Sequence, residues 1–151
     1  MERTRMIDPR QPRVGQAITG LVLGFGFVLD APQVLPAIAV VLALASLAGG
    51  PFNPYLYAYQ GVRRSLRWGP PAELEEAAPP RFANTIGLGF TAAASIMYFG
   101  FHLHVAAWIL GLIVAALALL AASSGLCVGC EFYVFARRLI AARRRRAEVG
   151  A

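Results

Sequence analysis

Two cysteines, Cys127 and Cys130, are the residues of this chain whose type and spacing could do chemistry. They are its only cysteines and lie three residues apart in the stretch SGLCVGCEF, at the end of a long apolar run. A break at residues 123–125 precedes a helix predicted from Glu131 onward, so Cys127 would lie just before a helix N-terminus and Cys130 in or near its first turn. Unpaired backbone N–H groups and the helix dipole at such a position stabilise a thiolate. The motif therefore predicts a dithiol and disulfide couple in which Cys127 attacks and Cys130 resolves.

Glu131 follows the motif directly. Its charge would disfavour a thiolate on Cys127, and its carboxylate could instead pass a proton.

Two further interpretations of the cysteines stay open. A structural zinc site needs four ligands, so a four-cysteine site for zinc or an iron–sulfur cluster would require two copies of the chain, and none is predicted within one copy. The cysteines could also be small apolar side chains that only pack.

The composition is that of an integral membrane protein. Hydrophobic residues make up 58% of the 151 residues and charged residues only 15%, whereas soluble domains carry about a quarter charged residues. Two blocks, residues 14–62 and 82–130, contain Asp30 as their only charged side chain. Each block is too long for one membrane crossing of about 20 residues and suits two.

Turn signals divide each block into two predicted transmembrane helices. Two prolines beside Asp30 end the first helix, and a tip that contains His102 and His104 separates the helices of the second block. The four predicted helices cover residues 14–29, 34–47, 82–101 and 105–124. Within the first, Gly20 and Gly24 form a GxxxG pattern that predicts close packing against another helix. The two histidines are interpreted as polar loop residues on the opposite side of the membrane from the cysteines.

The basic residues predict the orientation. All 14 are arginines, both hairpin tips lack them, and they lie at residues 3–13, 63–81 and 137–146. The positive-inside rule places these three segments, and hence both termini and the cysteine motif, in the cytoplasm. Thiols there are kept reduced, so a permanent structural disulfide is not expected. The net charge of +6 then reflects topology and attraction to anionic lipid, not nucleic-acid binding.

An internal repeat organises the chain. Residues 12–18 and 80–86 share Pro-Arg, an apolar residue, a small residue, a side-chain amide (Gln16 or Asn84), a variable residue and Ile. Each opens a hairpin that is followed by an aromatic, amphipathic segment ending in Arg-Arg. We therefore predict an all-α fold: an integral membrane four-helix bundle built from two parallel hairpin repeats, each followed by an amphipathic interfacial helix. The expected units of this single membrane domain are residues 14–68, a proline-rich cytoplasmic linker at 69–81, and residues 82–146.

Three motifs carry a resemblance to a known family. They are DPRQPRVGQAI at residues 8–18, PPAELEEAAPPRFAN at 70–84 and GLCVGCE at 125–131. Over about residues 6–140 the chain is similar to an uncharacterised family of bacterial membrane proteins, domain of unknown function 4395. The resemblance implies a small four-helix protein of the bacterial inner membrane with a cytoplasmic-side CxxC motif, and it implies no established activity. Relatives that occur beside thioredoxin-like and sulfurtransferase proteins indicate partners of those kinds.

The leading hypothesis is a membrane-embedded thiol and disulfide relay, or a sulfane-sulfur relay, that uses Cys127, Cys130 and Glu131. Its expected partners are the lipid bilayer and a cytoplasmic thioredoxin-like or sulfurtransferase protein, and homo-oligomers are left open. A quinone is a candidate electron partner that no single residue identifies. The alternative from another class is a non-enzymatic membrane subunit or small-solute permease with structural cysteines.

Overall fold

The computed structural model describes residues 6–48, 52–71, 73–125 and 127–149, and these are mostly helical. The α-helices of this described part are α1 (Arg10–Val28), α2 (Val34–Ala43), α3 (Pro54–Ser65), α4 (Ala78–Phe99), α5 (His104–Ser124) and α6 (Val128–Val149). A π-helical turn, η1 (Leu44–Ala48), continues α2. Two short strands, β1 (Met6–Ile7) and β2 (Glu75–Glu76), pair antiparallel. The all-α prediction is confirmed.

Proline and turn chemistry fix the helix boundaries. α1 and α4 both begin four residues before the predicted starts. Pro12 and Pro80 then lie in the first helical turn, where the backbone N–H groups have no partner inside the helix, so proline does not interrupt it. At the far end of α1, Asp30 adopts a positive φ of 48°, and the chain turns into α2 as the sequence predicted.

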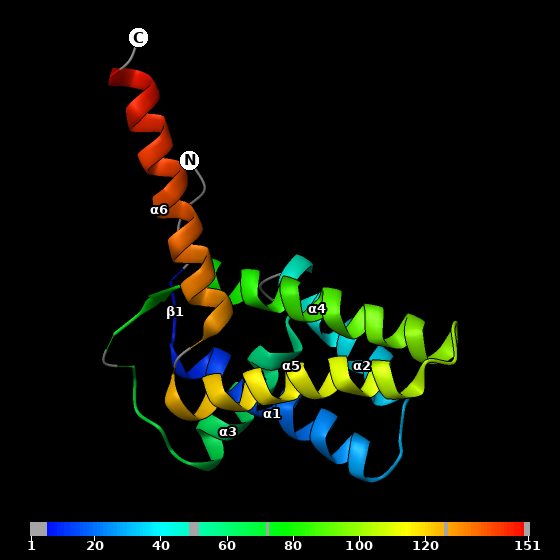
Figure 1. Cartoon of the computed structure of the whole chain (residues 1–151). Coiled ribbons are helices and arrows are strands. Elements are labelled where there is room, and N and C mark those ends of the chain that lie inside the picture. Colours follow the sequence, from blue (N-terminus) through cyan, green and yellow to red (C-terminus); the bar gives the residue numbers. More distant parts are fainter. Residues whose placement is uncertain (1–5, 49–51, 72, 126, 150–151) are drawn as a thin grey trace.

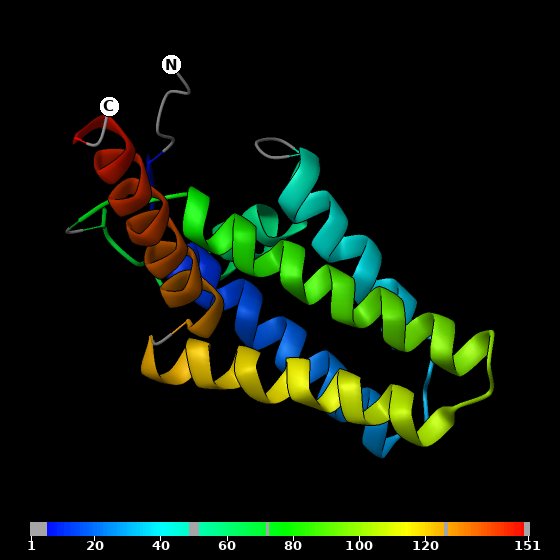
Figure 2. The same cartoon turned by 45° about the horizontal axis from the view of Figure 1, so that its top comes forward.

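The helices α1, α2, α4 and α5 pack as a bundle in which sequence neighbours are not the main partners. α1 lies along α5, α2 along α4, and α4 also packs on α5 (Figures 1 and 2). Gly20 permits the close approach of α1 to α5, because a Cβ there would lie 2.5 Å from Leu119 Cγ. Gly24 has nothing within 4 Å of such a Cβ. The close packing predicted for the GxxxG pattern thus involves Gly20 alone.

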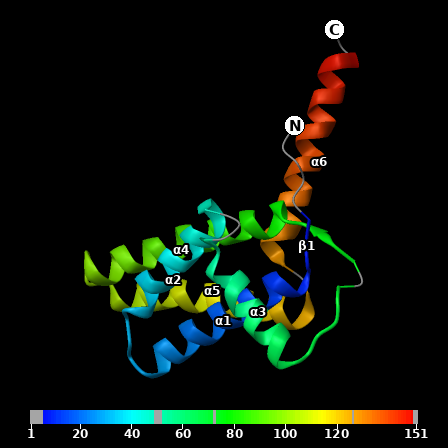
Figure 3. The same ribbon diagram turned by 180° about the vertical axis from the view of Figure 1, so that it is seen from behind.

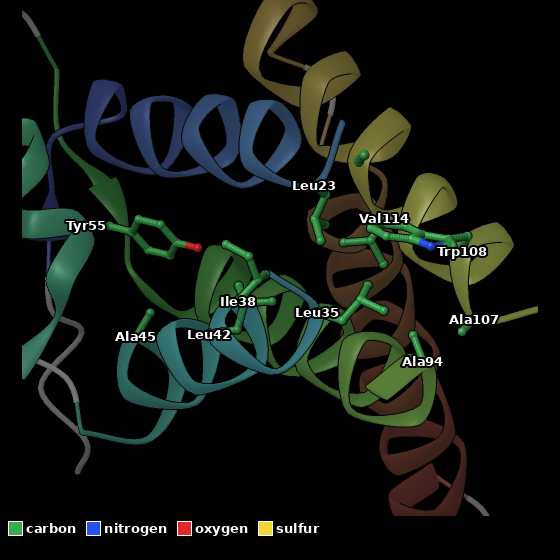
Figure 4. Close-up of a cluster of buried hydrophobic side chains, with 11 residues drawn as sticks. Leu23, Leu35, Ile38, Leu42, Ala45, Tyr55, Ala94, Ala107, Trp108 and Val114 are labelled. Carbon is green, nitrogen blue, oxygen red and sulfur yellow. The ribbon is translucent and has the colours of Figure 1, made fainter. Parts of the chain in front are cut away.

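The core lies between these four helices (Figure 4). Leu23 of α1 and Leu35 of α2 are fully buried, and Trp108 of α5 joins the same cluster. Tyr55 points into the cluster from α3, and its hydroxyl shares a hydrogen bond with the Thr19 hydroxyl of α1. This buried polar contact attaches α3 to the bundle.

The two ends of the bundle differ. Both hairpin tips lie at one end, whereas the start of α1, the end of α5 and the start of α6 lie at the other (Figure 1). From there α6 runs across the direction of the bundle helices (Figures 1 and 3). The cysteine motif therefore lies at the opposite end from His102 and His104.

Two helices of the described chain, α4 and α5, are long and apolar enough to cross a membrane. Only 11% and 28% of their most apolar windows are buried inside the protein, whereas the core helix of a soluble protein would be mostly buried. α2 and η1, with 10 and 5 residues, span about 22 Å, short of a hydrocarbon core of about 30 Å. Large apolar side chains nevertheless face outward on all four bundle helices, among them Phe25, Val40, Ile96 and Ile109. The four crossings stay a prediction.

Candidate functional site at the CxxC motif

The structure places Cys127 and Cys130 at the junction of α5 and α6. Gly125 ends α5 in the left-handed conformation, with φ of 74°, which glycine adopts without strain. α6 begins at Val128, three residues before the predicted start, and the Glu131 N–H donates to the Cys127 carbonyl at 3.0 Å. Cys127 thus directly precedes the first helical residue, and Cys130 lies in the first turn, as the sequence predicted.

The glycine inside the motif brings the start of α6 against α4. A Cβ at Gly129 would lie 2.8 Å from Ala83 Cβ, a separation that real Cβ atoms essentially never show. Beside this contact, the rings of Phe82 and Tyr133 pack with centroids 5.5 Å apart. A larger residue at Gly129 would therefore push the cysteine-bearing turn away from the bundle.

Two N–H donors contact the sulfur of Cys127. The backbone N–H of Cys130 donates to Cys127 Sγ at 3.4 Å, and Gln16 Nε2 of α1 donates at 3.5 Å. Both thiols are free and partly buried. The first contact is that of a helix N-cap with sulfur in place of oxygen, and the second connects the motif to the first hairpin.

These contacts make the two thiols chemically different. The hydrogen bond from the Cys130 thiol lowers the pKa of Cys127 from 9.0 to about 6, helped by the backbone N–H groups and the Gln16 amide and opposed by partial burial. The same hydrogen bond raises the pKa of Cys130, as do burial and the negative charges of Cys127, Glu75 and Glu131. These shifts favour a thiolate on Cys127 and a thiol on Cys130 at neutral pH, the difference that a nucleophile and a resolving cysteine require.

An apolar cavity of about 460 Å³ lies beside Cys127. α1, α2, α4, α5 and α6 all contribute to its walls, and apart from Cys127 the described residues that line it have no ionisable side chain. Polar groups at the cavity include the thiol of Cys127 and the side-chain amides of Gln16 and Asn84. A second cavity of about 280 Å³, lined in part by Asn53 and Tyr55, shares these two amides. Gln16 and Asn84 thus line both cavities.

The linker and the N-terminal segment cover this end of the bundle. β1 pairs with β2, which holds Glu75 and Glu76, and Glu76 Oε2 lies 3.9 Å from Arg137 Nη1 of α6. The Asp8 carboxylate accepts the Arg10 N–H at 2.9 Å and also the Tyr59 hydroxyl of α3. Part of the linker is thus paired with the N-terminal strand, where the sequence predicted only a proline-rich connector.

The family model of a domain of unknown function, DUF4395, matches residues 7–138. The chain belongs to this family. No curated protein and no solved structure gives a significant match. The DUF4395 match contains both cysteines and Glu131, together with Gln16 and Asn84, so the whole candidate site lies within the family domain.

Sequence reasoning located the cysteines and Glu131 but missed their partner from α1. Gln16 lies 111 residues from Cys127 in the chain, and no local motif connects them. One signal did exist, because Gln16 and Asn84 are the side-chain amides that the two repeated segments share. A side-chain amide that recurs within an apolar block indicates a hydrogen-bonding role inside the bundle.

The other candidate residues do not join the site. The rings of His102 and His104 are 6.1 Å apart, and His104 stacks on Tyr98 with centroids 4.4 Å apart. Among the described residues, no group of three or more His, Cys, Asp or Glu side chains is placed to hold a metal ion. A four-cysteine metal site would thus need a second copy of the chain.

Proposed function

We propose that this DUF4395 chain is a membrane-embedded dithiol protein in which Cys127 is the nucleophile and Cys130 resolves. It exchanges electrons, or sulfane sulfur, with a thioredoxin-like or sulfurtransferase partner at the cysteine-bearing end of the bundle. One observation carries the proposal. Cys127 Sγ caps the N-terminus of α6, contacted by the Cys130 N–H and the Gln16 amide, with a second thiol one turn away. A partly exposed thiolate with such donors is what thiol and disulfide exchange needs.

In the exchange step, the Cys127 thiolate attacks one sulfur of the partner's disulfide. A mixed disulfide forms, and the partner's other sulfur leaves as a thiolate and takes a proton. Cys130 then loses its proton to Glu131 and attacks Cys127 Sγ, so that the partner leaves as a dithiol and this chain holds a disulfide, oxidised by two electrons. With a persulfide partner, the same thiolate takes the outer sulfur and leaves a thiol behind.

The raised pKa of Cys130 suits this order of events. One of its causes is the negative charge of Cys127, which disappears once Cys127 is bonded to the partner. Cys130 becomes easier to deprotonate only at that point. The resolving step is thereby favoured after the mixed disulfide has formed.

We also propose that all four bundle helices cross the membrane. α1 packs along α5 and α2 along α4, so two helices that reach across a bilayer would carry the other two with them. The outward apolar side chains of α1 and α2 support this, because water would hydrate them poorly. The crosswise direction of α6 suits a helix that lies in the membrane interface (Figure 1).

The two hairpins with their following helices are, in this proposal, copies of one unit. Gly15 and Ala83 occupy the same place in the repeated sequence. A Cβ at Gly15 would lie 2.8 Å from the Tyr55 ring of α3, just as a Cβ at Gly129 of α6 would lie 2.8 Å from Ala83. Both units thus bring a small residue near the start of their first helix against the helix that follows the hairpin.

Disulfide exchange with glutathione tests the function. The protein in lipid nanodiscs is equilibrated with glutathione buffers of graded potential. Its free thiols are then alkylated, and mass spectrometry counts the alkylated and glutathionylated cysteines. Cys130→Ser should accumulate a mixed disulfide at Cys127, because the resolving thiol is gone, whereas Cys127→Ser should not. Inert cysteines in both variants would contradict the proposal and favour a membrane subunit or small-solute permease. Zinc or iron at about half an equivalent per chain, lost in Cys130→Ser, would favour a shared metal site instead.

A further inference from the structure

The large cavity extends from the reactive cysteine along apolar side chains of the bundle helices. Its volume of about 460 Å³ falls within the range of small-molecule sites, roughly 300–1,000 Å³. Leu42, Ile113 and Leu117 lie on its walls, whereas Cys127 contributes at the end where α6 begins. A molecule in this cavity would contact the thiolate and lie against hydrocarbon side chains.

The lining defines the chemistry of the occupant. Apart from Cys127, the described lining residues have no ionisable side chain, so the walls offer no partner for a charged group and the occupant is neutral. The amide of Asn84 makes no side-chain hydrogen bond to another described residue, and the Gln16 amide has one long contact, to Cys127 Sγ at 3.5 Å. Amide N–H groups are donors that match carbonyl oxygens. Phe90 of α4 and Phe132 of α6 add aromatic faces against which a flat ring can pack.

We propose that this cavity binds a lipid-soluble quinone, which takes electrons from the Cys127 and Cys130 dithiol. The inference rests on the proposed dithiol function and names its second electron partner: a dithiol partner reduces the Cys127–Cys130 disulfide by the reverse of the exchange step above, and the quinone then takes the two electrons. A lipid acyl chain would match the apolar walls, but it has no hydrogen-bond acceptor for the two amides and no group that reacts with the thiol. A quinone matches the walls, the donors and the two-electron chemistry together.

The two electrons pass to the quinone through a carbon–sulfur adduct at Cys127. The Cys127 thiolate adds to a ring carbon of the quinone and forms a carbon–sulfur bond. Cys130 gives up its proton and attacks Cys127 Sγ, which forms the disulfide and breaks the carbon–sulfur bond. The released electron pair stays on the ring, which takes one proton from Cys130 and one from water and leaves as a hydroquinone. Two electrons and two protons thus pass from dithiol to quinone, counting the proton that Cys127 released earlier.

The test uses decylubiquinone and the full chain, reduced and kept anaerobic in lipid nanodiscs. Hydroquinone formation is followed by absorbance, and loss of free thiols by mass. Ala118→Phe fills the cavity from α5, because Ala118 lies on its wall, and should slow hydroquinone formation about tenfold or more. Ala116→Phe is the matched control on the same helix, since Ala116 is exposed and lies outside the lining, and it should behave like the unchanged protein. Iodoacetamide alkylation of Cys127 checks that the motif still folds in each variant.

A measurement without electron transfer completes the test. In the double variant Cys127→Ser, Cys130→Ser, a photoreactive azidoquinone should label the cavity walls, Phe90 or Phe132 among them, and decylubiquinone should compete. Equal hydroquinone formation in the Ala118 and Ala116 variants, or labelling elsewhere, would overturn the inference. Exchange with glutathione but no hydroquinone would overturn it and leave the dithiol function standing. Loss of both activities would remove the dithiol function and the quinone inference together.

Discussion

Replacing Cys130 by alanine should move the pH at which Cys127 becomes reactive from about 6 toward its ordinary value of 9.0. The Cys130 thiol supplies the largest contribution to the lowered pKa of Cys127, and alanine removes that donor. Serine keeps a hydroxyl donor at the same position. Cys130→Ser should therefore retain most of the shift, which makes the two substitutions a matched pair.

The expected rates follow from the two pKa values. At pH 7 a thiol with a pKa of about 6 is about 90% thiolate, whereas one with a pKa of 9.0 is about 1% thiolate. The thiolate of lower pKa is also the weaker nucleophile, by about 20-fold over three pKa units. Alkylation of Cys127 should then be about fourfold faster than that of an unshifted thiol at pH 7, about 20-fold faster at pH 6 and about tenfold slower at pH 9. The two pH profiles cross, so their shape cannot be mistaken for a change in access.

The assay is the rate of iodoacetamide alkylation as a function of pH in nanodiscs, with the modified cysteine assigned by peptide mass. Gln16→Leu removes a smaller contribution and should raise the pKa of Cys127 less than Cys130→Ala does. A midpoint near 9 in the unchanged protein would refute the reasoning. So would identical profiles for Cys130→Ala and the unchanged protein, because the Cys130 thiol donor would then have no effect.

Three further outcomes are expected. Gly129→Ala should lower the free energy of unfolding by about 1–3 kcal/mol and raise the pKa of Cys127, because its Cβ would meet α4. Gly24→Ala is the control and should be neutral or stabilising, because the space around its Cβ is open. Denaturation in detergent compares the free energies of unfolding of the two variants. Tyr55→Phe should cost about 1 kcal/mol through the lost hydrogen bond to Thr19, and a double-mutant cycle with Thr19→Val measures the coupling; additive effects would exclude the bond as the cause. In a chain lacking both native cysteines, His102→Cys should react with an impermeant maleimide only from outside the cell, and labelling from the cytoplasmic face would contradict the topology.

The helices were predictable because apolar blocks and their breaks are local. The prolines after Asp30 and the tip around His102 marked the hairpins, and the structure turns at both. Length was harder to predict. α2 ends after 10 residues and passes into a π-helical turn, although the apolar run continues to Leu47, so hydropathy alone overestimated its regular helix.

The cysteine motif was predictable for the same reason, since a Ser-Ser-Gly break and a following helix can be recognised in a short window. The partners of the motif were not. Gln16 reaches Cys127 only because α1 packs along α5, which is a tertiary arrangement that no short window contains. The cavity depends on five helices at once and could not be predicted from any one of them.

The proposed repeat gives a physical reason why the thiol chemistry lies in the second unit and not in the first. When Arg63 is aligned with Arg137, Asn53 occupies the position of Cys127. Asn53 Oδ1 accepts the Tyr55 N–H at 3.0 Å as the N-cap of α3, and Cys127 Sγ accepts a backbone N–H at the start of α6 in the same way. A helix N-cap already directs N–H donors at its side chain, so sulfur at that position inherits the donors that favour a thiolate.

The neighbouring position separates the units further. The same alignment pairs Tyr55 with Gly129; Tyr55 lines the cavity of about 280 Å³, and Gly129 lines the cavity of about 460 Å³. In the first unit the Tyr55 ring lies against Gly15, whereas in the second unit Gly129 lies directly against Ala83 of α4. The exchange of an asparagine cap for cysteine supplies a nucleophile, and the exchange of tyrosine for glycine lets the start of α6 pack against α4, which keeps that nucleophile at the wall of the larger cavity. Both are needed, because a thiolate without the cavity would meet only partners in water, and the cavity without the thiolate would hold a quinone that nothing reduces.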